Sequence, residues 1–337
     1  MRRVAIGDPQ APLATFFAVL DRHALRGADG RLRSDVMLIS MGDHFDWGKP
    51  NEAARAADDG LRLLEWLASH DDDQVVLIAG NHDLGRVGEL SAFDDESFAR
   101  ARAEATVVYR DGKTDREGER AFLERWPALP TAELAARDFS SYRASQRDLV
   151  TELLRSGRFR LAWAPDDERL FLHAGITAPQ LRAAGIDPTS GAKAIAAALD
   201  RALKEAVAAW PGPPARLDIP NIHRPGDAAY GEGDGVLYHR AARDVKPRRY
   251  DPRELPLGLL QAIGHVRDKK SRELLGGEWT DGLAAEDGPL RHLVTNGNDV
   301  HYQRGLPDRV NPNLATMIFL DSGMNHTPPD CYDVLEV

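Results

Sequence analysis

The sequence contains a single cysteine, Cys331, among 337 residues, so no disulfide can form within the chain. One cysteine suits a reducing compartment. The amino-terminal stretch MRRVAIGDPQAP reaches an acid and two prolines before any apolar run long enough for a signal peptide. We therefore expect a protein that is not exported by that route and is located in the cytoplasm.

Long apolar runs and an excess of positive charge are also missing. No run approaches the roughly 20 residues of a transmembrane helix, and the formal net charge is -10. Broad binding to nucleic acid or to an anionic membrane requires a basic face. The composition therefore argues against both kinds of partner, although it leaves room for a local cationic pocket.

Seven short apolar runs are spread along the chain, and they read RRVAIGD, VMLISMGD, VVLIAGNHD, RLFLHAG, LLQAIGHV, TMIFLDSG and CYDVLEV. Continuous apolar runs of this length predict strands that are buried on both faces. Between them, residues 51–69 and an alanine-rich segment at about 189–209 have the composition and spacing of helices. Strands that alternate with helices predict an α/β fold.

Two segments depart from this alternation. Residues at about 86–160 hold charged helical stretches together with YRDGKTDREGE, which we expect to form an exposed turn or flexible loop. Residues at about 210–256 begin with WPGPPARLDIPNIHRPGD, whose prolines interrupt any helix. We predict one domain over 1–337, with a helical insertion at about 86–160 and an irregular segment on the substrate side at about 210–256.

Six of the predicted strands end in a polar residue beside a glycine. In α/β sheets, ligands bind outside the carboxyl ends of the strands, so we expect these residues to converge on one site. Carboxylate, amide and imidazole groups suit divalent ions such as Mn²⁺, Fe²⁺ or Zn²⁺. The inventory is large enough for two ions that share a carboxylate. The six residues are Asp8, Asp43, Asn81, His173, His265 and Asp321.

Five motifs resemble those of a known family. They are GDPQ at 7–10, GDHFDWG at 42–48, GNHD at 80–83, HAG at 173–175 and GH at 264–265. In this order they resemble the metallophosphoesterase (calcineurin-like) superfamily, and within it the phosphoprotein phosphatase branch with its bacterial Shewanella-like members and the symmetrical diadenosine tetraphosphatases. The resemblance implies a four-layer αββα sandwich with two divalent metal ions at the strand ends.

The resemblance also implies roles for individual residues. His82 would be the general acid for the leaving oxygen, and Asp46 would orient its imidazole. Asn81 would contact both a metal and the substrate. Asp43 would bridge the two ions. The implied ligands are Asp8, Gln10 and Asp43 for the first metal, and Asp43, Asn81, His173 and His265 for the second.

Three positions depart from the family pattern. Gln10 stands where the family usually has a histidine, which implies an altered first metal site. Trp47 replaces an arginine that usually grips the phosphate, and it is equally compatible with packing and with substrate binding. The segment GVLYHR at 235–240 resembles one in which bacterial members carry another phosphate-binding arginine. Arg240 is therefore the candidate clamp, with a solvated surface arginine as the alternative.

The resemblance leads us to expect a metal-dependent hydrolase of phosphomonoesters, similar to protein serine/threonine phosphatases and acting on a phosphoprotein or a nucleotide. Gln10 and the GNHD form of the third motif favour an alternative, a hydrolase of dinucleoside polyphosphates or other nucleotides. Trp47 and Gln10 favour a third possibility, a degenerate scaffold that binds metal and a phosphorylated ligand without turnover. His44 and His326 lie next to motif residues and receive no role.

Overall fold

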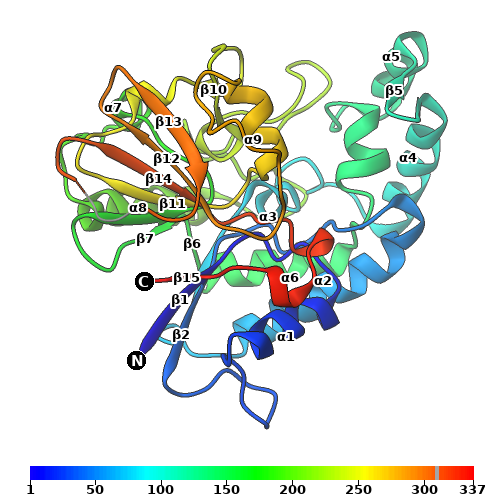
Figure 1. The fold of residues 1–337 in the computed structure, drawn as a ribbon. Coiled ribbons are helices and arrows are strands. Elements are labelled where there is room, and N and C mark those ends of the chain that lie inside the picture. The colour runs from blue at the N-terminus through cyan, green and yellow to red at the C-terminus, as the bar shows by residue number, and fades with distance from the viewer. Residues whose placement is uncertain (308–310) are drawn as a thin grey trace.

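Two β-sheets pack face to face between outer helices in the computed structural model of the protein, which describes residues 1–307 and 311–337 (Figure 1). The first sheet has five strands in the order β15-β1-β2-β3-β6. Its four strands other than β15 run parallel, and β15 pairs antiparallel with β1. The strands are β1 (Arg2–Ile6), β2 (Val36–Ser40), β3 (Val75–Ile78), β6 (Phe159–Arg160) and β15 (Leu335–Glu336).

The second sheet has six strands in the order β13-β12-β14-β11-β8-β7. Its central strands β14, β11 and β8 are parallel, and antiparallel partners close both edges. The strands are β7 (Ala162–Trp163), β8 (Arg169–Leu172), β11 (Leu260–Ile263), β12 (Arg291–Thr295), β13 (Val300–Arg304) and β14 (Ala315–Phe319).

Successive residues of a strand pack in different apolar layers. Ala5 and Ile39 belong to the cluster between the two sheets, with Ala262 and Ile318 from the opposite sheet. The neighbouring Leu38 belongs instead to the larger cluster beneath the helices. Because both faces of these parallel strands are covered, their sequences read as continuous apolar runs. The predicted α/β, four-layer αββα architecture is therefore confirmed.

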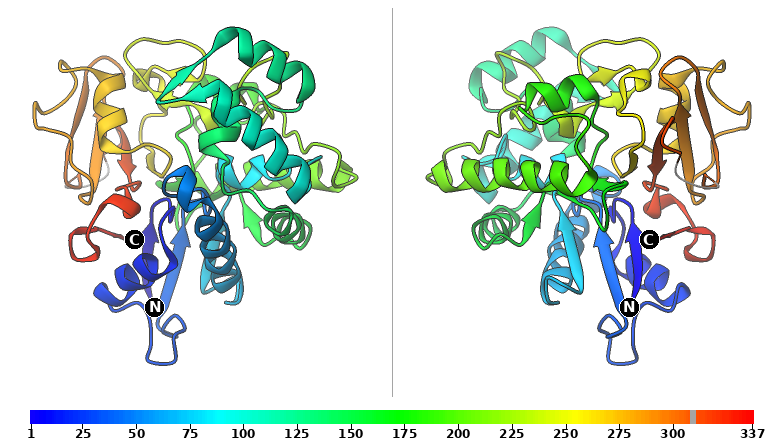
Figure 2. Two further views of the ribbon diagram at one scale, coloured as in Figure 1. Left: turned by 90° about the vertical axis from the view of Figure 1, so that its right-hand side faces the viewer. Right: turned by 90° about the vertical axis from the view of Figure 1, so that its left-hand side faces the viewer.

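The helices cover the outer faces of the two sheets (Figures 1 and 2). Apolar residues of α1, α2 and α6 lie in one cluster with the outward residues of the first sheet, and α8 packs on β7 and β8. The helices are α1 (Leu13–Arg22), α2 (Ala53–Ala68), α3 (Asn81–Gly85), α4 (Asp95–Val108), α5 (Arg116–Arg125), α6 (Ala144–Arg155), α7 (Ala178–Ala183), α8 (Ala192–Ala209) and α9 (Asp268–Leu275).

Residues 86–160 contain α4, α5, α6 and a one-turn π-helix, η2 (Leu134–Asp138). Leu90, Phe98, Phe122 and Phe139 belong to an apolar cluster of this segment. Its helices α4 and α5 project from one side of the sandwich (Figures 1 and 2), whereas α6 packs against α2 and the first sheet. The stretch that we expected to be an exposed turn forms a small hairpin of β4 (Tyr109–Arg110) and β5 (Lys113–Thr114).

Residues 210–256 have little regular structure, as their prolines predict. They contain β9 (Arg240–Ala241), β10 (Arg249–Tyr250) and two short 3₁₀ helices, η3 (Val236–Tyr238) and η4 (Pro252–Glu254). Three further 3₁₀ turns are η1 (Pro50–Glu52), η5 (Met324–His326) and η6 (Pro329–Cys331). Leu217, Ile222 and Leu237 of the irregular segment join the same larger cluster beneath the helices that contains Leu38.

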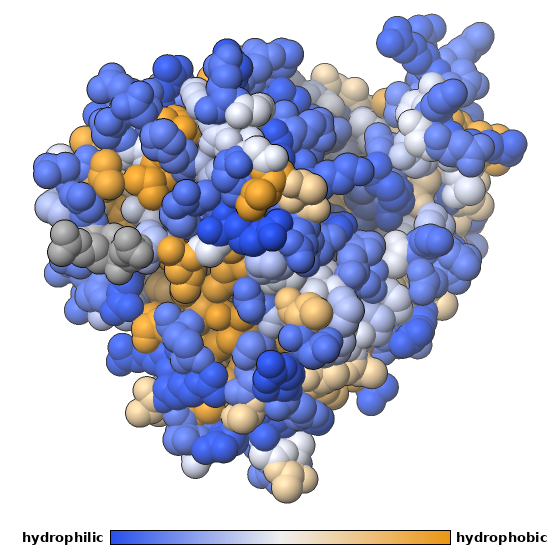
Figure 3. Space-filling model, in the orientation of Figure 1, coloured by the Kyte–Doolittle hydropathy of each residue, from blue (hydrophilic) through white to orange (hydrophobic). Residues whose placement is uncertain are grey.

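The surface seen in the orientation of Figure 1 is largely hydrophilic, with apolar groups confined to smaller areas (Figure 3). None of the helices within 1–307 and 311–337 combines the length and the apolar character that crossing a bilayer requires.

Candidate active site

Polar residues follow the carboxyl ends of six strands in the two sheets. Asp8 follows β1, Asp43 follows β2 and Asn81 follows β3, all in the first sheet. His173, His265 and Asp321 follow β8, β11 and β14 in the second sheet. Within each sheet these strands are parallel, so each set of three residues emerges at one edge. Asp8, Asp43, Asn81, His265 and Asp321 line one cavity of about 240 Å³.

The glycine beside each polar residue allows the loops to approach one another. A Cβ atom on Gly80 would lie 2.1 Å from Oδ1 of Asp43, and one on Gly264 would lie 2.0 Å from Oδ1 of Asp8. Asp43 and His265 themselves have φ angles of 55° and 65°, in the left-handed region that few residues with a side chain adopt. Strained backbone of this kind gathers at functional sites.

Four side chains, each from a different motif, converge at the second predicted metal position. The ligand atoms of Asp43, His173 and His265 all lie within 4.8 Å of one another. Nε2 of His173 lies 3.1 Å from Oδ1 of Asn81 and 3.2 Å from Nδ1 of His265. The opposite nitrogen of His173, Nδ1, lies 2.8 Å from the carbonyl oxygen of Met41, so as a donor it leaves Nε2 free to bind a metal.

Two of the residues predicted for the first metal, Asp8 and Gln10, line the same cavity as Asp43. Asp8 is buried, and both of its carboxylate oxygens accept the backbone N–H of His265 at 3.0 Å. Burial, then the charges of Asp321 and Asp43, raise the pKa of Asp8 well above its usual value. Gln10 is half-buried and lines the same cavity.

The buried carboxylates of Asp8, Asp43 and Asp321 repel one another unless a cation lies between them. Burial and then the nearby Arg240 charge lower the pKa of His265 well below its usual value, so the imidazole is neutral, as a metal ligand must be. Carboxylate, amide and imidazole donors fit divalent Mn, Fe or Zn. The donor set therefore fits the two predicted ions.

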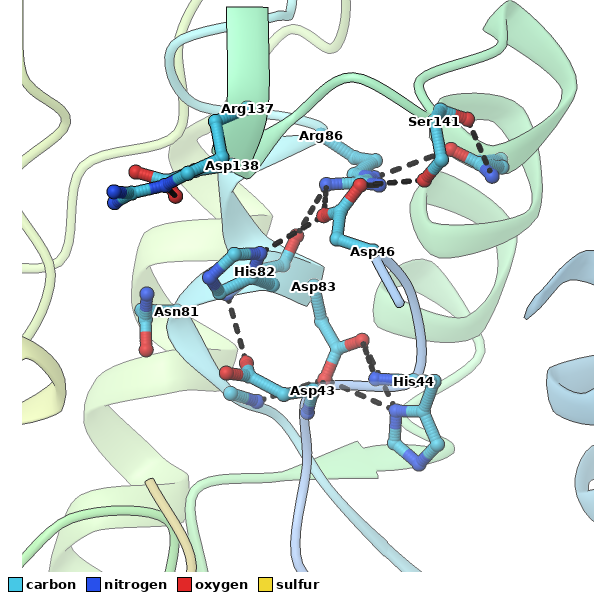
Figure 4. A network of polar contacts seen from close by, with 12 residues as sticks. Asp43, His44, Asp46, Asn81, His82, Asp83, Arg86, Arg137, Asp138 and Ser141 are labelled. Carbon is cyan, nitrogen blue, oxygen red and sulfur yellow. Dashed lines mark hydrogen bonds and ion pairs between the residues drawn. The ribbon is translucent and has the colours of Figure 1, made fainter. Parts of the chain in front are cut away.

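His82 and Asp46 form the predicted pair. Nδ1 of His82 lies 2.8 Å from Oδ2 of Asp46, and the backbone N–H of His82 donates to Oδ1 of Asp43 at 2.8 Å (Figure 4). Burial alone would lower the pKa of His82, but the charge of Asp43 and the hydrogen bond to Asp46 raise it to about 9. The imidazole is therefore protonated at neutral pH, the form that a general acid requires.

Arg240 lies where a phosphate clamp is needed. It lines the 240 Å³ cavity together with the metal-site residues and His82. Within 1–307 and 311–337, no carboxylate lies within 4.0 Å of its guanidinium, and its hydrogen bond goes to the carbonyl oxygen of Tyr238 at 3.4 Å. Burial, then the nearby Arg248, lower the pKa of Arg240. A half-buried guanidinium without a counter-ion is suited to an anionic ligand.

Trp47 is 5% exposed and lines a neighbouring cavity of about 170 Å³ with Asp8 and Gln10. Its ring packs beneath the guanidinium of Arg55 at 5.2 Å. Its indole N–H has no hydrogen-bond partner among the described residues. The structure thus places Trp47 beside the site, and the choice between a packing role and a substrate-binding role stays a prediction.

A third cavity, of about 310 Å³, continues from the metal-site cavity past His82. Asn81, His82, Arg240 and Lys270 line both cavities. The helical insertion contributes Thr131, Glu133, Leu134, Arg137, Asp138 and Phe139 to its walls, and the irregular segment contributes Glu232, Gly233, Tyr238 and Arg248. This volume lies at the lower end of the range for small-ligand pockets.

Several contributors to the site were not predicted. Arg86 and Ser141 contact Asp46, and Asp83 contacts the loop that carries Asp43. His44 is fully buried between Asp83 and Ser40. Arg267 and Lys270 line the metal-site cavity, but they pair with Asp287 and Glu273. The signal available for Asp83 was its place in the GNHD motif; Ser141 had none.

One comparison with known proteins agrees with this geometry. A family model described as calcineurin-like phosphoesterase matches residues 1–204. No curated protein is similar enough to give a match. A crystal structure of a mutant cold-active protein tyrosine phosphatase is similar over 62% of this chain and 48% of that chain, about half its length, with 17% identity and a TM-score of 0.34. A TM-score this low does not establish a shared fold.

Proposed function

Because this chain belongs to the calcineurin-like phosphoesterase family, we propose that it is a metal-dependent hydrolase of phosphate monoesters, similar to protein serine/threonine phosphatases. The observation that carries the proposal is the convergence of Asp43, Asn81, His173 and His265 beside the Asp46-bound His82. Phosphoryl transfer depends mainly on positioning and on electrostatic stabilisation, and these residues are suited to both.

Two divalent ions would be held by Asp8, Gln10 and Asp43 on one side and by Asp43, Asn81, His173 and His265 on the other. When bound, such ions polarise a phosphoryl oxygen and activate a water molecule. Which metal is native, with Mn among the candidates, is part of the proposal, as is a cytoplasmic location, which rests on the single exposed Cys331.

Other residues of the site bind the phosphate and donate the proton to the leaving group. Arg240 binds the non-bridging oxygens of the phosphate, and Asn81, which lines the same cavity, contacts both a metal and the phosphate. His82 donates its proton to the leaving oxygen as the bond to phosphorus breaks, and Asp46 holds its imidazole. The alcohol that leaves occupies the 310 Å³ cavity beyond His82, which has room for one side chain or one small molecule.

A second candidate is hydrolysis of dinucleoside polyphosphates or other nucleotides. Three cations, Arg240, Arg267 and Lys270, line the metal-site cavity, and this number favours a substrate with more than one phosphate. We rank it second because the cations of the leaving-group cavity other than Arg240 are already paired: Arg137 with Glu133 and Asp138, Arg248 with Glu232, and Lys270 with Glu273. A second phosphate would therefore have to compete with these carboxylates.

The experiment that tests the proposal measures phosphate release and metal content together. Protein stripped of metal and reconstituted with Mn²⁺, Fe²⁺ or Zn²⁺ is offered p-nitrophenyl phosphate, phosphoserine and phosphotyrosine peptides, and diadenosine tetraphosphate. We expect about two ions per chain and metal-dependent hydrolysis of the monoesters. Faster hydrolysis of the dinucleotide would favour the second candidate. Bound metal without any hydrolysis would instead indicate a phospho-ligand scaffold.

A further inference from the structure

Arg86 is fully buried, yet its guanidinium lies beside the proposed catalytic pair. Nη1 donates to Oδ2 of Asp46 at 2.6 Å, and Nη2 donates to Oδ1 of the same carboxylate at 2.8 Å (Figure 4). This parallel, two-bond arrangement fixes the plane of the Asp46 carboxylate as well as its position. A lysine, with one compact ammonium group, cannot reproduce it.

The residues around Arg86 stabilise its buried positive charge. The guanidinium carbon lies 4.6 Å from the ring centre of Phe45 and 5.2 Å from that of Phe139. Nε donates to Oε1 of Gln146 at 3.3 Å, and Nη1 also donates to the carbonyl oxygen of His82 at 3.2 Å. A buried charge persists only where it is paired and hydrogen-bonded, and Arg86 meets both conditions.

Asp46 is held from a third direction by the helical insertion. The hydroxyl of Ser141 donates to Oδ1 of Asp46 at 2.5 Å, and the backbone of Asp46 has a φ angle of 66°. Phe139, which stacks on Arg86, also meets the ring of His82 edge-on at 5.2 Å. Three residues of the insertion, Phe139, Ser141 and Gln146, therefore contact the Arg86, Asp46 and His82 chain directly.

We propose that Arg86 is a positioning residue for the proton donor: it fixes the Asp46 carboxylate so that Asp46 fixes Nδ1 of His82 and directs Nε2 toward the leaving oxygen. Ser141 serves the same end from the helical insertion, which is thereby part of the catalytic unit. This inference rests on the proposed phosphomonoesterase function. In the step it supports, a water oxygen forms the new bond to phosphorus, the bond from phosphorus to the leaving oxygen breaks, and the Nε2 proton of His82 is transferred to that leaving oxygen.

Comparing substrates with different leaving groups distinguishes this positioning role from a purely structural one. A p-nitrophenolate ion is stable without a proton, whereas an alkoxide ion is not. Misplacing the proton donor should therefore slow the release of an alkyl alcohol much more than the release of p-nitrophenol. Loss of fold or of metal would slow both reactions alike.

The test compares Arg86→Lys and Ser141→Ala with wild type in the metal-reconstituted enzyme, with β-glycerophosphate and p-nitrophenyl phosphate as substrates. For Arg86→Lys we expect kcat on β-glycerophosphate to fall at least about tenfold more than kcat on p-nitrophenyl phosphate, with KM and metal content close to wild type. Ser141→Ala, which removes one hydrogen bond, should show the same selectivity with a smaller loss. His82→Asn sets the largest selectivity that loss of the donor can produce.

Arg158→Lys is the matched control, because Arg158 is also largely buried, pairs with Asp72 at 2.9 Å and bonds the carbonyl of Val75 away from the site. It should show no selectivity. The positioning role would be overturned if the variants lost kcat equally on both substrates. It would also be overturned if neither Arg86→Lys nor Ser141→Ala lowered kcat. A wild-type enzyme that hydrolyses neither substrate would contradict the proposed function itself, and the positioning role with it.

Discussion

The carboxylate of Asp83 accepts the backbone N–H of Asp43 at 2.9 Å and so ties the third motif to the second. The same carboxylate accepts the backbone N–H groups of Gly80 at 2.8 Å and His44 at 3.1 Å, and it pairs with Nδ1 of His44 at 3.0 Å (Figure 4). Both side chains of this pair are fully buried. Asp83 therefore fixes the loop that carries Asp43, the proposed bridging ligand.

Asp83→Ala should lower the free energy of unfolding by about 3 kcal/mol or more, because it leaves three buried backbone donors and His44 without their acceptor. Metal content should fall with it, since the Asp43 loop loses its support. Urea unfolding and elemental analysis would measure the two effects. Asp72→Ala, which removes an exposed acid from an ion pair with Arg158, should cost no more than about 1 kcal/mol. Similar costs for the two variants would refute the role of Asp83.

His82→Asn should leave about two metal ions per chain and lower turnover of an alkyl phosphomonoester by roughly 10²- to 10⁴-fold, the usual range for a lost proton donor. Asparagine keeps a polar group against Asp46 but has no proton to give at neutral pH. Steady-state kinetics beside elemental analysis would check this. Unchanged turnover would remove His82 from the role of general acid.

Much of the sheet architecture could be predicted because parallel strands buried on both faces leave continuous apolar runs, as in β1, β2 and β14. The β12–β13 hairpin was missed for the converse reason. β12 buries Arg291 and His292, and β13 alternates buried and exposed residues at the sheet edge, so neither reads as an apolar run. The turn signal NGND between them was the clue available.

Positions at strand ends could be predicted for the same reason, since the strand and the glycine after it are local in sequence. The contacts of Asp46 could not. Ser141 lies 95 positions away along the chain, and only the folded path of the helical insertion brings it near. Arg86 is close in sequence to His82, but a buried arginine at this position looks in sequence like the many surface arginines of this chain.

Gln10→His should tighten metal binding at the first site, because imidazole generally binds these divalent ions more strongly than a neutral amide oxygen does. Gln10 is half-buried and lines both cavities that contain Asp8, so the new side chain faces the same space. Competition with a chelator would give the affinities of the two ions. Weaker binding in the variant would show that the first site is built around glutamine.

His223 should make stability depend on pH below neutrality. Its ring is fully buried, stacks on Tyr238 and lies 3.0 Å from the Tyr238 hydroxyl through Nδ1. Burial, then the charge of Arg216, lower the pKa of His223 from 6.5 to about 3. Between these two values the unfolded chain binds a proton that the folded chain does not, so stability falls as the pH falls from 6.5 toward 3.

For this histidine alone, the free energy of unfolding should fall by about 2 kcal/mol between pH 7 and pH 5. Urea unfolding at several pH values should show it, and His223→Gln, which does not titrate, should flatten the profile by that amount. An exposed histidine, His301, provides the control, because His301→Gln should leave the slope unchanged. A wild-type profile that His223→Gln does not alter would refute the assignment.

Arg240→Lys tests the anion clamp. With Trp47 in place of the family's usual arginine, the phosphate needs positive charge from another side chain, and Arg240 lines the metal-site cavity without a carboxylate partner among residues 1–307 and 311–337. A guanidinium can bind two phosphate oxygens at once, whereas an ammonium cannot match that geometry. The substitution should therefore lower kcat/KM by at least about tenfold, or roughly 1.4 kcal/mol of transition-state stabilisation.

Metal content and unfolding midpoint should stay at their wild-type values in Arg240→Lys, which separates a lost clamp from a damaged site. Arg243→Lys is the neighbouring control, because Arg243 is exposed and pairs with Glu278 at 2.8 Å, and its kinetics should match wild type. If Arg240→Lys also matched wild type, the clamp would have to come from elsewhere in the cavity. Arg267 would then be the next side chain to replace, since it lies between the metal-site cavity and the one that Trp47 lines.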